Sequence, residues 1–398
     1  FVAHPPERYL YSDMQGYYER SVKYASGEKE NIYDSLYPPA THFIYSIFFK
    51  LPNPFFWIKL FNVCISTTTC LLIYLITKDL FGQRAGYLSL AISSLDYIFI
   101  DFTGYFLSET LFTFMLALMF YCFLKSVMET SGHRWLYSLL AGQSIIIAGA
   151  VKSSILLVIP LFGIWWLLKV MEYRFHWNLI FYALGFLPFF IFLSMRIFIL
   201  TGEHGVISTN GGLNFFMGRS HVKDVYFEDR ERGTRYFFAS PVAVQKNYSY
   251  NDKFNTGPYD ADFFYKKGMD IARKDIPKTL LYSLEHVYDL FISTTIWPSS
   301  AIKKPFPTLI EISNVLFTFL IIIPSVCFAC SRFRTLAQGY GILVIFPIAV
   351  IILTSMIYYG DPRFRVPYDV FFIILAGFFY TELVNGVIKF MQEPARLY

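Results

Sequence analysis

Long apolar runs separated by short polar stretches make up most of the chain. Spanning a bilayer takes about 17 to 25 apolar residues, and nine runs come close to that length or reach it. They cover residues 55–77, 85–100, 104–124, 135–151, 153–170, 178–200, 308–330, 336–357 and 367–389. A further run, 40–51, is too short to span and predicts a half-buried helix at the membrane surface. The pattern therefore predicts an all-α polytopic membrane protein.

Two polar stretches divide the chain into four parts. The first part, 1–54, contains a polar and aromatic segment that ends at Pro38 and Pro39. Because these prolines favour extended geometry before them and suit the first turn of a helix, the segment predicts a short amphipathic helix, a loop and then re-entry into the membrane. The remaining parts are a first transmembrane half, a polar region and a second transmembrane half, at 55–200, 201–306 and 307–398.

The polar region has helical spacing only toward its end. Ala261–Lys274 places its apolar residues at helical intervals, and Pro277 begins a second amphipathic helix suited to the membrane surface. Residues 220–258 are charged and aromatic without a clear period. We therefore expect an irregular loop followed by two helices.

The composition agrees with a membrane protein. Of the 398 residues, 55% are hydrophobic and only 16% are charged, and the net charge of +5 is too small to indicate a partner. No basic stripe interleaved with aromatic residues indicates nucleic acid. The five cysteines all lie in apolar runs, so no disulfide framework is implied. Cys327 and Cys330 have the spacing of a redox motif, but their apolar surroundings predict buried apolar side chains.

Lysine and arginine residues in the short loops predict the orientation of the chain. They occur after the first, third, fifth and seventh runs, at Lys78, Arg84, Lys125, Arg134, Arg174, Arg332 and Arg334. By simple alternation these loops share one side, which is predicted to be cytoplasmic. The first part of the chain and the polar region then lie on the opposite, periplasmic or lumenal, side.

Side chains that could carry chemistry gather on that opposite side. They are Asp13, Tyr37, His42, Asp101, Glu109, Lys152, Arg363 and Arg365. The three cations are the most informative, because short outer turns seldom carry cations. Plain structural roles stay open: a headgroup anchor for each cation, a helix cap for Glu109, a packed ring for His42 and a solvated loop acid for Asp13.

The turn Gly-Asp-Pro-Arg-Phe-Arg-Val-Pro carries two of these cations, Arg363 and Arg365. If the turn is extended, their side chains point the same way. Two guanidinium groups on one face suit a phosphate, since each can bind it through two donors. No HExxH, Walker, GxSxG or Cys/His zinc pattern occurs, so no motif of the sequence indicates a metal site.

Six segments, in order, resemble those of the GT-C membrane glycosyltransferases that use polyprenyl-phosphate sugars. They are the first loop with Asp13 and Tyr37-Pro38-Pro39, the pair Ser108-Glu109, AGQSIIIAGAVKSSILLVIP, NGGLNFFMGRS, DADFFYKKGMDIARKDIPKTL and GDPRFRVP. Within that superfamily the chain looks most like the bacterial branch near protein mannosyltransferases, aminoarabinose transferases and rhizobial-type galacturonosyltransferases. The resemblance implies a GT-C-like helical bundle, with a further span before the first loop.

The resemblance also implies roles for the polar residues. Asp13 would take the proton of the acceptor hydroxyl or amine, helped by Asp101 or Glu109. The three outer cations would bind and stabilise the leaving phosphate. The implied substrate contacts are Tyr37, His42, Asn214 and Arg219. The aromatic residues implied for a prenyl-chain groove are Phe371, Phe372 and Phe378.

The function implied is transfer of a sugar from a polyprenyl-phosphate donor to a lipid, glycan or protein acceptor. It would take place on the periplasmic face of a bacterial inner membrane. Many relatives carry an Asp-Glu pair in the first loop, whereas Asp13 is followed by Met14 here. No cofactor is therefore certain, and a divalent metal stays open.

Two other classes of protein remain. A transporter or flippase for a lipid-linked sugar would carry polar residues at mid-bilayer and often an internal repeat, and neither is clear in this sequence. A non-catalytic assembly subunit of the same fold would differ from an enzyme by as little as one Asp.

Overall fold

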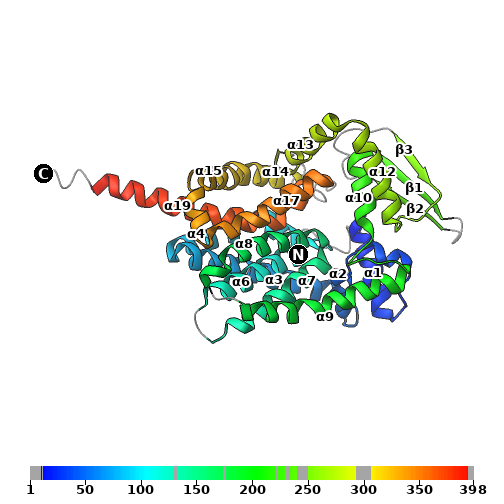
Figure 1. Ribbon diagram of the computed structural model, residues 1–398, viewed down its shortest axis with the longest axis horizontal. Coiled ribbons are helices and arrows are strands. Elements are labelled where there is room, and N and C mark those ends of the chain that lie inside the picture. The colour runs from blue at the N-terminus through cyan, green and yellow to red at the C-terminus, as the bar shows by residue number, and fades with distance from the viewer. Residues whose placement is uncertain are drawn as a thin grey trace.

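The structure, a computed structural model, is a bundle of long helices with a small lobe at one end (Figure 1). It describes residues 10, 12–129, 132–173, 176–220, 222–229, 234–239, 250–292 and 306–392. Apolar helices lie alongside one another, and short helices and a small sheet cover the end near the first part of the chain. The predicted all-α architecture is confirmed.

Seven helices in the described part of the chain are long and apolar enough to cross a membrane. The continuous ones are α3 (Pro54–Phe81), α6 (Glu109–Met128), α7 (Arg134–Val151) and α9 (His176–Thr201). The others are built from consecutive pieces: α14 (Phe306–Phe317), η5 (Thr318–Ile322) and α15 (Ile323–Ser331); η6 (Tyr340–Val344) and α17 (Ile345–Ile357); α18 (Pro362–Arg365), η7 (Val366–Tyr368) and α19 (Asp369–Gln392). The short α16 (Phe333–Gln338) connects α15 to η6.

The expected span 85–100 is wrong as a single helix. It forms α4 (Gln83–Leu95) and α5 (Tyr97–Phe102). Asp96 separates them, because its side chain caps α5 by accepting the Ile98 N–H at 3.0 Å. The 13 residues of α4 reach only about 20 Å, short of a hydrocarbon core of roughly 30 Å.

The expected span 153–170 is also not a single α-helix. It begins as η3 (Ser153–Leu157) and continues as α8 (Val158–Tyr173). Its apolar part, Ser153–Lys169, is shorter than the seven candidate spans. The count by length and composition is therefore seven rather than nine in the described residues.

Contacts nevertheless show that both short segments run along the bundle. Glu109 at the start of α6 contacts Arg363 at the end near the first part of the chain, so α4 and α5 must return the chain from the far end of α3. Arg196 near the end of α9 contacts Glu30 at that same end, so the segment after Lys152 must lead away before α9 returns. The alternation of loops between two sides thus holds here, and the side that faces the cytoplasm stays a prediction.

The first part of the chain forms the predicted short helix and loop. It contains α1 (Asp13–Ser26), η2 (Ile32–Leu36) and α2 (Ala40–Phe48). α1 ends at Gly27, whose φ of 77° favours glycine and lets its N–H bond back to Tyr24 O at 3.2 Å. This geometry turns the chain back over the end of the bundle.

The polar region folds around its own small core. α10 (Asn210–Ser220) and α12 (Ala261–Lys274) contribute to it, α13 (Ile276–Ile292) follows α12, and both predicted helices are confirmed. The stretch expected to be irregular instead contains β1 (Asp224–Asp229), β2 (Thr234–Ala239) and β3 (Asn251–Phe254). The strand order is β2-β1-β3, with β1 antiparallel to β2 and parallel to β3. The core residues are Leu213, Phe216, Met217, Val222, Val225, Phe227, Phe254 and Phe264.

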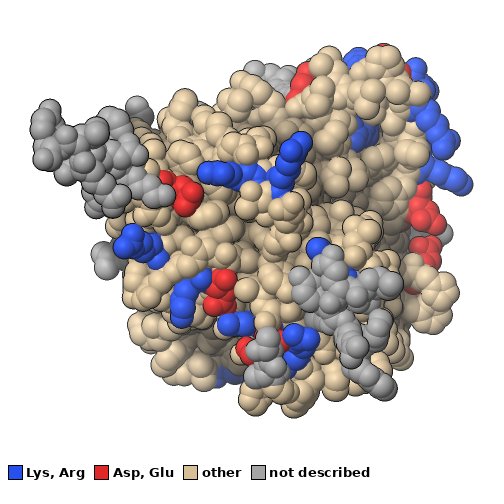
Figure 2. Space-filling view, turned by 60° about the vertical axis from the view of Figure 1, so that its left-hand side comes forward, with Lys and Arg blue, Asp and Glu red and all other residues tan. Residues whose placement is uncertain are grey.

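The outside of the bundle is apolar, as a lipid-facing surface requires. Leu168 and Ile199 are each 74% exposed, and Figure 2 shows mostly uncharged surface with scattered lysine and arginine side chains. Cys327 and Cys330 are exposed, so the expectation of buried side chains is wrong for this pair. Apolar runs predict membrane contact as readily as core packing.

A cysteine at Asp270 tests the predicted side of the polar region. Asp270 is exposed on α12, so Asp270→Cys is expected to react with an impermeant thiol reagent in intact cells. Lys78→Cys, at the exposed end of α3 on the predicted cytoplasmic side, is the matched control and should react only after lysis. Labelling is read by mass shift against the unsubstituted protein, and the reverse pattern would overturn the predicted orientation.

Candidate active site

Four charged side chains meet at the end of the bundle that carries the first part of the chain. Arg363 donates from Nε to Glu109 Oε1 at 2.6 Å and from Nη1 to Asp13 Oδ2 at 2.8 Å. Lys152 Nζ donates to the same Glu109 oxygen at 2.9 Å. We name Asp13, Glu109, Lys152 and Arg363 the charged cluster. Two acids and two bases make its formal charge zero, and all four were expected at the site.

The local sequence fixes the position of each side chain. Glu109 is the first residue of α6, where a carboxylate suits the helix dipole. Asp361 caps α18 by accepting the Arg363 N–H at 2.8 Å. Gly360 allows this turn to approach α13, because a Cβ at that position would lie only 1.7 Å from the carbonyl oxygen of His286. The turn before α18 is therefore held close to both α6 and α13.

Burial differs sharply across the charged cluster. The side chain of Glu109 is fully buried and that of Arg363 is 10% exposed, whereas that of Asp13 is 53% exposed. Burial lowers the pKa of Lys152, and the neighbouring Glu109 opposes this shift. Glu109 Oε2 has no hydrogen-bond partner in the described residues. Asp13 is therefore the most exposed member of the charged cluster, and Glu109 contacts the two cations from its buried side.

The expected shared direction of Arg363 and Arg365 is wrong. The turn is helical in α18 rather than extended, so side chains two residues apart point to different sides. Arg365 is fully buried, with Nε donating to Asp369 Oδ1 at 3.0 Å and Nη2 donating to Asn314 Oδ1 at 2.7 Å. It joins α18 to α14 and α19, and only Arg363 of the pair faces the charged cluster.

Asp101 lies apart from the charged cluster. It belongs to α5, where burial raises its pKa to about 7 and Tyr105 is its polar neighbour. It forms no ion pair with the charged cluster in the described part of the chain. No ion pair between described residues therefore supports the helper role expected of Asp101. Glu109, in contrast, forms ion pairs with both Lys152 and Arg363.

Arg219 also faces away from the charged cluster. It lies at the end of α10 and is buried, and burial lowers its pKa. Its Nη1 donates to Ser283 Oγ at 2.9 Å, and its Nη2 donates to the carbonyl oxygens of Met356 at 2.5 Å and Ile357 at 2.8 Å. Arg219 thus holds the end of α17 against α13, and its substrate contact stays a prediction.

Asn214 reaches the charged cluster through Tyr359. The Tyr359 hydroxyl donates to Asn214 Oδ1 at 3.3 Å. Burial raises the pKa of Tyr359, and the nearby negative charge of Asp13 adds to the shift. Asn214 therefore connects the polar region to the charged cluster, although it touches none of the four charged groups directly.

Tyr37 and His42 contact α1 on the face that carries Asp13, farther along the helix. The guanidinium of Arg20 lies 3.5 Å from the centroid of the Tyr37 ring. His42 is fully buried beside Tyr24, with ring centroids 5.2 Å apart. Burial lowers the pKa of His42 well below its usual range, and the charges of Arg20 and Arg196 lower it further. His42 is therefore neutral at pH 7.

Sequence analysis missed Arg196, which anchors the first part of the chain to α9. Its Nε donates to Glu30 Oε1 at 2.9 Å, and its Nη2 donates to the Asp34 carbonyl oxygen at 2.8 Å. Lys23 Nζ donates to the Asp34 carboxylate at 2.6 Å. A lone arginine inside an apolar run is the signal that could have revealed this contact, because such cations are costly in a membrane unless they are paired.

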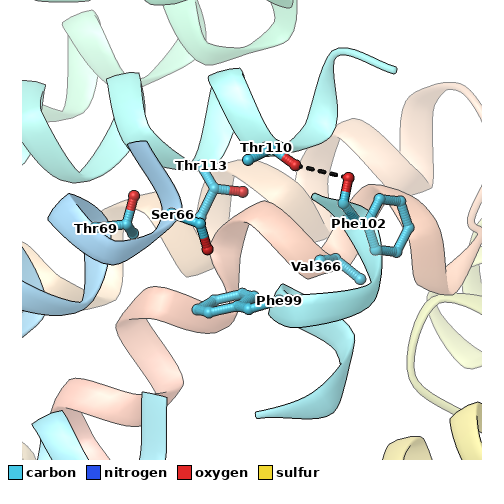
Figure 3. Close-up of a pocket in the computed structure, with 7 residues that line it drawn as sticks. All are labelled: Ser66, Thr69, Phe99, Phe102, Thr110, Thr113 and Val366. Atoms are coloured by element: carbon cyan, nitrogen blue, oxygen red, sulfur yellow. Dashed lines mark hydrogen bonds between the residues drawn. The ribbon is translucent and has the colours of Figure 1, made fainter. Parts of the chain in front are cut away.

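A small pocket lies beside the start of α6, where Thr110, the residue after Glu109, forms part of its lining (Figure 3). Its lining residues are Ser66, Thr69, Phe99, Phe102, Thr110, Thr113 and Val366. Thr110 Oγ1 donates to the Phe102 carbonyl oxygen at 3.0 Å. The interior is about 10 Å³, close to the space that one water molecule needs. The pocket is therefore too small for a prenyl chain.

The aromatic residues expected to line a prenyl groove belong to the core instead. Phe371 and Phe372 are 0% and 1% exposed. Phe378 stacks on Phe81 with ring centroids 4.3 Å apart. Phe371 and Phe372 therefore cannot line a groove, whereas Phe378 is partly exposed.

The described residues hold no group of three or more His, Cys, Asp or Glu side chains that could bind a metal ion. Within the charged cluster, Asp13 binds Arg363 and Glu109 binds both cations. The two carboxylates are thus already paired with side chains.

Comparisons with known proteins bear on the first half of the chain. Residues 37–198 match the family model for dolichyl-phosphate-mannose-protein mannosyltransferase. The match includes Glu109 and Lys152 and confirms, over that part of the chain, the predicted resemblance to membrane glycosyltransferases. No curated protein matches the sequence.

One solved structure is similar at low identity: ArnT from Cupriavidus metallidurans in the apo state, with 13% sequence identity and a TM-score of 0.33. The similarity covers 86% of this chain and 66% of that chain, slightly under two thirds. A likeness this weak carries no argument about the fold or the activity.

Proposed function

We propose that this protein is an integral membrane glycosyltransferase that moves a sugar from a polyprenyl-phosphate donor to an acceptor hydroxyl or amine. The observation that carries this proposal is the charged cluster, in which the exposed carboxylate of Asp13 lies 2.8 Å from Arg363. Such a transfer needs a base for the proton of the acceptor and cations for the leaving phosphate. Asp13 supplies the base, and Arg363 and Lys152 supply the cations.

Donor binding changes what Arg363 contacts. The donor phosphate takes the place of Asp13 at Arg363 Nη1, and this frees the Asp13 carboxylate beside the anomeric carbon. The acceptor oxygen or nitrogen bonds to that carbon while the bond from the carbon to the phosphate oxygen breaks. The electron pair of the broken bond leaves with polyprenyl phosphate, and the proton of the acceptor passes to Asp13.

Glu109 is a positioning residue in this scheme. Its buried Oε1 accepts from both Arg363 and Lys152, at 2.6 Å and 2.9 Å. Two cations so close together would otherwise repel each other. Glu109 therefore keeps both pointed at the place of the phosphate, and it does not exchange a proton with the substrate.

The side of the membrane and the acceptor class complete the proposal. We place the site on the periplasmic face of a bacterial inner membrane, supported by the cations in the loops of the opposite side. The acceptor is a lipid, a glycan or a protein. The match of residues 37–198 to a family of mannosyltransferases supports the use of a lipid-phosphate sugar donor.

Lipid extracts from cells that lack the gene test the proposal by mass spectrometry. We expect one glycosylated product to disappear and a polyprenyl-phosphate sugar to accumulate. A plasmid with the wild-type gene should restore the product, and one with Asp13→Asn should not. Full restoration by Asp13→Asn would favour a non-catalytic subunit, and unchanged extracts would refute the proposal.

A further inference from the structure

One face of α1 continues from the charged cluster toward the loop. Asp13, Tyr17, Arg20 and Tyr24 follow one another at helical spacing, so their side chains share that face. Arg20 stands seven residues from Asp13, which is about 10 Å along the helix. A substrate that reaches Asp13 can therefore extend toward Arg20.

Arg20 is a cation that pairs with no carboxylate in the described part of the chain. Its guanidinium stacks on Tyr37 at 3.5 Å and lies 5.5 Å from the ring of Tyr17. Among the described residues no carboxylate pairs with Arg20, and its Nε is buried without a hydrogen-bond partner. The residue as a whole is partly exposed. A guanidinium stacked on a ring is oriented in advance and keeps its donors for another group.

Polar atoms near Arg20 also lack hydrogen-bond partners in the described residues. Both ring nitrogens of His42 and Nη1 of Arg196 are buried without partners in the described part of the chain. The nearby acids are already used, because Glu30 binds Arg196 and Asp34 binds Lys23. Polar atoms without described partners therefore lie near a cation that pairs with no described carboxylate.

We propose that Arg20, stacked on Tyr37, forms an anion site for a carboxylate or phosphate carried by the substrate, separate from the phosphate of the donor. The inference rests on the proposed function for the reaction, and it narrows the substrate to one that carries a second negative charge. The anion belongs either to the transferred sugar or to the acceptor. In both cases Arg20 fixes one end of the substrate while its reacting atom lies near Asp13.

Two probes with the same sugar ring isolate the contribution of the charge. We expect the purified wild-type protein to bind methyl glucuronide at least tenfold more tightly than methyl glucoside in calorimetric titrations, and to bind inorganic phosphate competitively with the glucuronide. Arg20→Gln should remove this preference, and Arg20→Lys should keep part of it. Lys29→Gln, which removes an exposed positive charge from the same loop, should keep it fully.

The affinity for undecaprenyl phosphate separates this inference from the proposed function. Arg20→Gln should leave that affinity unchanged, because the donor phosphate binds at Arg363 and Lys152. If the preference for glucuronide is absent in the wild type or survives in Arg20→Gln, the anion site is refuted even when undecaprenyl phosphate still binds. If undecaprenyl phosphate fails to bind the wild type, the proposed function is refuted instead.

Two lipid-linked donors then assign the source of the anion. We compare polyprenyl phosphoglucuronate with polyprenyl phosphoglucose for the wild type and Arg20→Gln. An anion on the transferred sugar predicts that Arg20→Gln weakens binding of the glucuronate donor alone. An anion on the acceptor predicts equal binding of both donors and a raised KM for the acceptor in Arg20→Gln. If the variant changes neither donor binding nor the acceptor KM, the anion site is refuted.

Discussion

Replacing Asp13 with asparagine is expected to lower the turnover of sugar transfer about a hundredfold or more, as removal of a general base does. Asparagine keeps the size and most of the hydrogen bonding of the side chain but cannot take the proton. Because the Asp13 side chain is 53% exposed, its loss should change stability little, since exposed ion pairs are worth roughly 0–1 kcal/mol. Turnover is measured on purified protein with the donor that accumulates in cells lacking the gene.

A second measurement on the same variant tests the exchange of partners at Arg363. In the free protein Asp13 occupies Arg363 Nη1, so Asp13→Asn should bind undecaprenyl phosphate more tightly than the wild type while transferring sugar more slowly. Glu19→Gln removes another exposed acid from α1 and should change neither quantity. Near-normal turnover in Asp13→Asn would mean that another group takes the proton.

The long helices and the residues of the charged cluster could be predicted from the sequence. Apolar length alone located the seven candidate spans, because a bilayer imposes a minimum length on a helix that crosses it. Asp13, Glu109, Lys152 and Arg363 stood out because charges are costly at a membrane surface unless they are used or paired. The structure brings these four together from distant segments.

The predictions that proved wrong for Arg365 and for the span 85–100 depended on local turn geometry. The direction of Arg365 depended on whether its turn is extended or helical, and Asp361-Pro362 is in fact a cap followed by the first residue of a helix. That signature was present in the sequence and predicts the observed α18. In the same way, the cap at Asp96 divides a run that hydropathy alone presents as one span.

Contacts between distant segments could not be derived from any single pattern. The stacking of Arg20 on Tyr37 and the bonds from Arg196 to Glu30 each depend on how the first part of the chain lies over the bundle. The strands of the polar region could not be predicted from the sequence for a similar reason. In β1 the side chains of Val225 and Phe227 are buried and that of Tyr226 is exposed, and α10 and α12 cover the buried face of the sheet.

Replacing Arg363 is expected to weaken binding of the polyprenyl-phosphate product. Alanine should cost roughly 1.5–3 kcal/mol, the value of a charge-assisted hydrogen bond, which is roughly ten- to a hundredfold in Kd. Lysine keeps the charge but loses the fork of donors that reaches Glu109 and Asp13 together, so it should restore only part of the affinity. Titration with undecaprenyl phosphate in detergent measures all three proteins.

Arg365→Lys is the matched control, because it makes the same change two residues away. Arg365 is bound to Asp369 and Asn314 inside the bundle, so lysine there should lower Tm through imperfect pairing of a buried charge. The folded fraction should still bind undecaprenyl phosphate as the wild type does. Equal affinities for the wild type, Arg363→Lys and Arg363→Ala would instead show that Arg363 only ties α18 to Glu109 and Asp13. The donor phosphate would then have to bind at Lys152 without it.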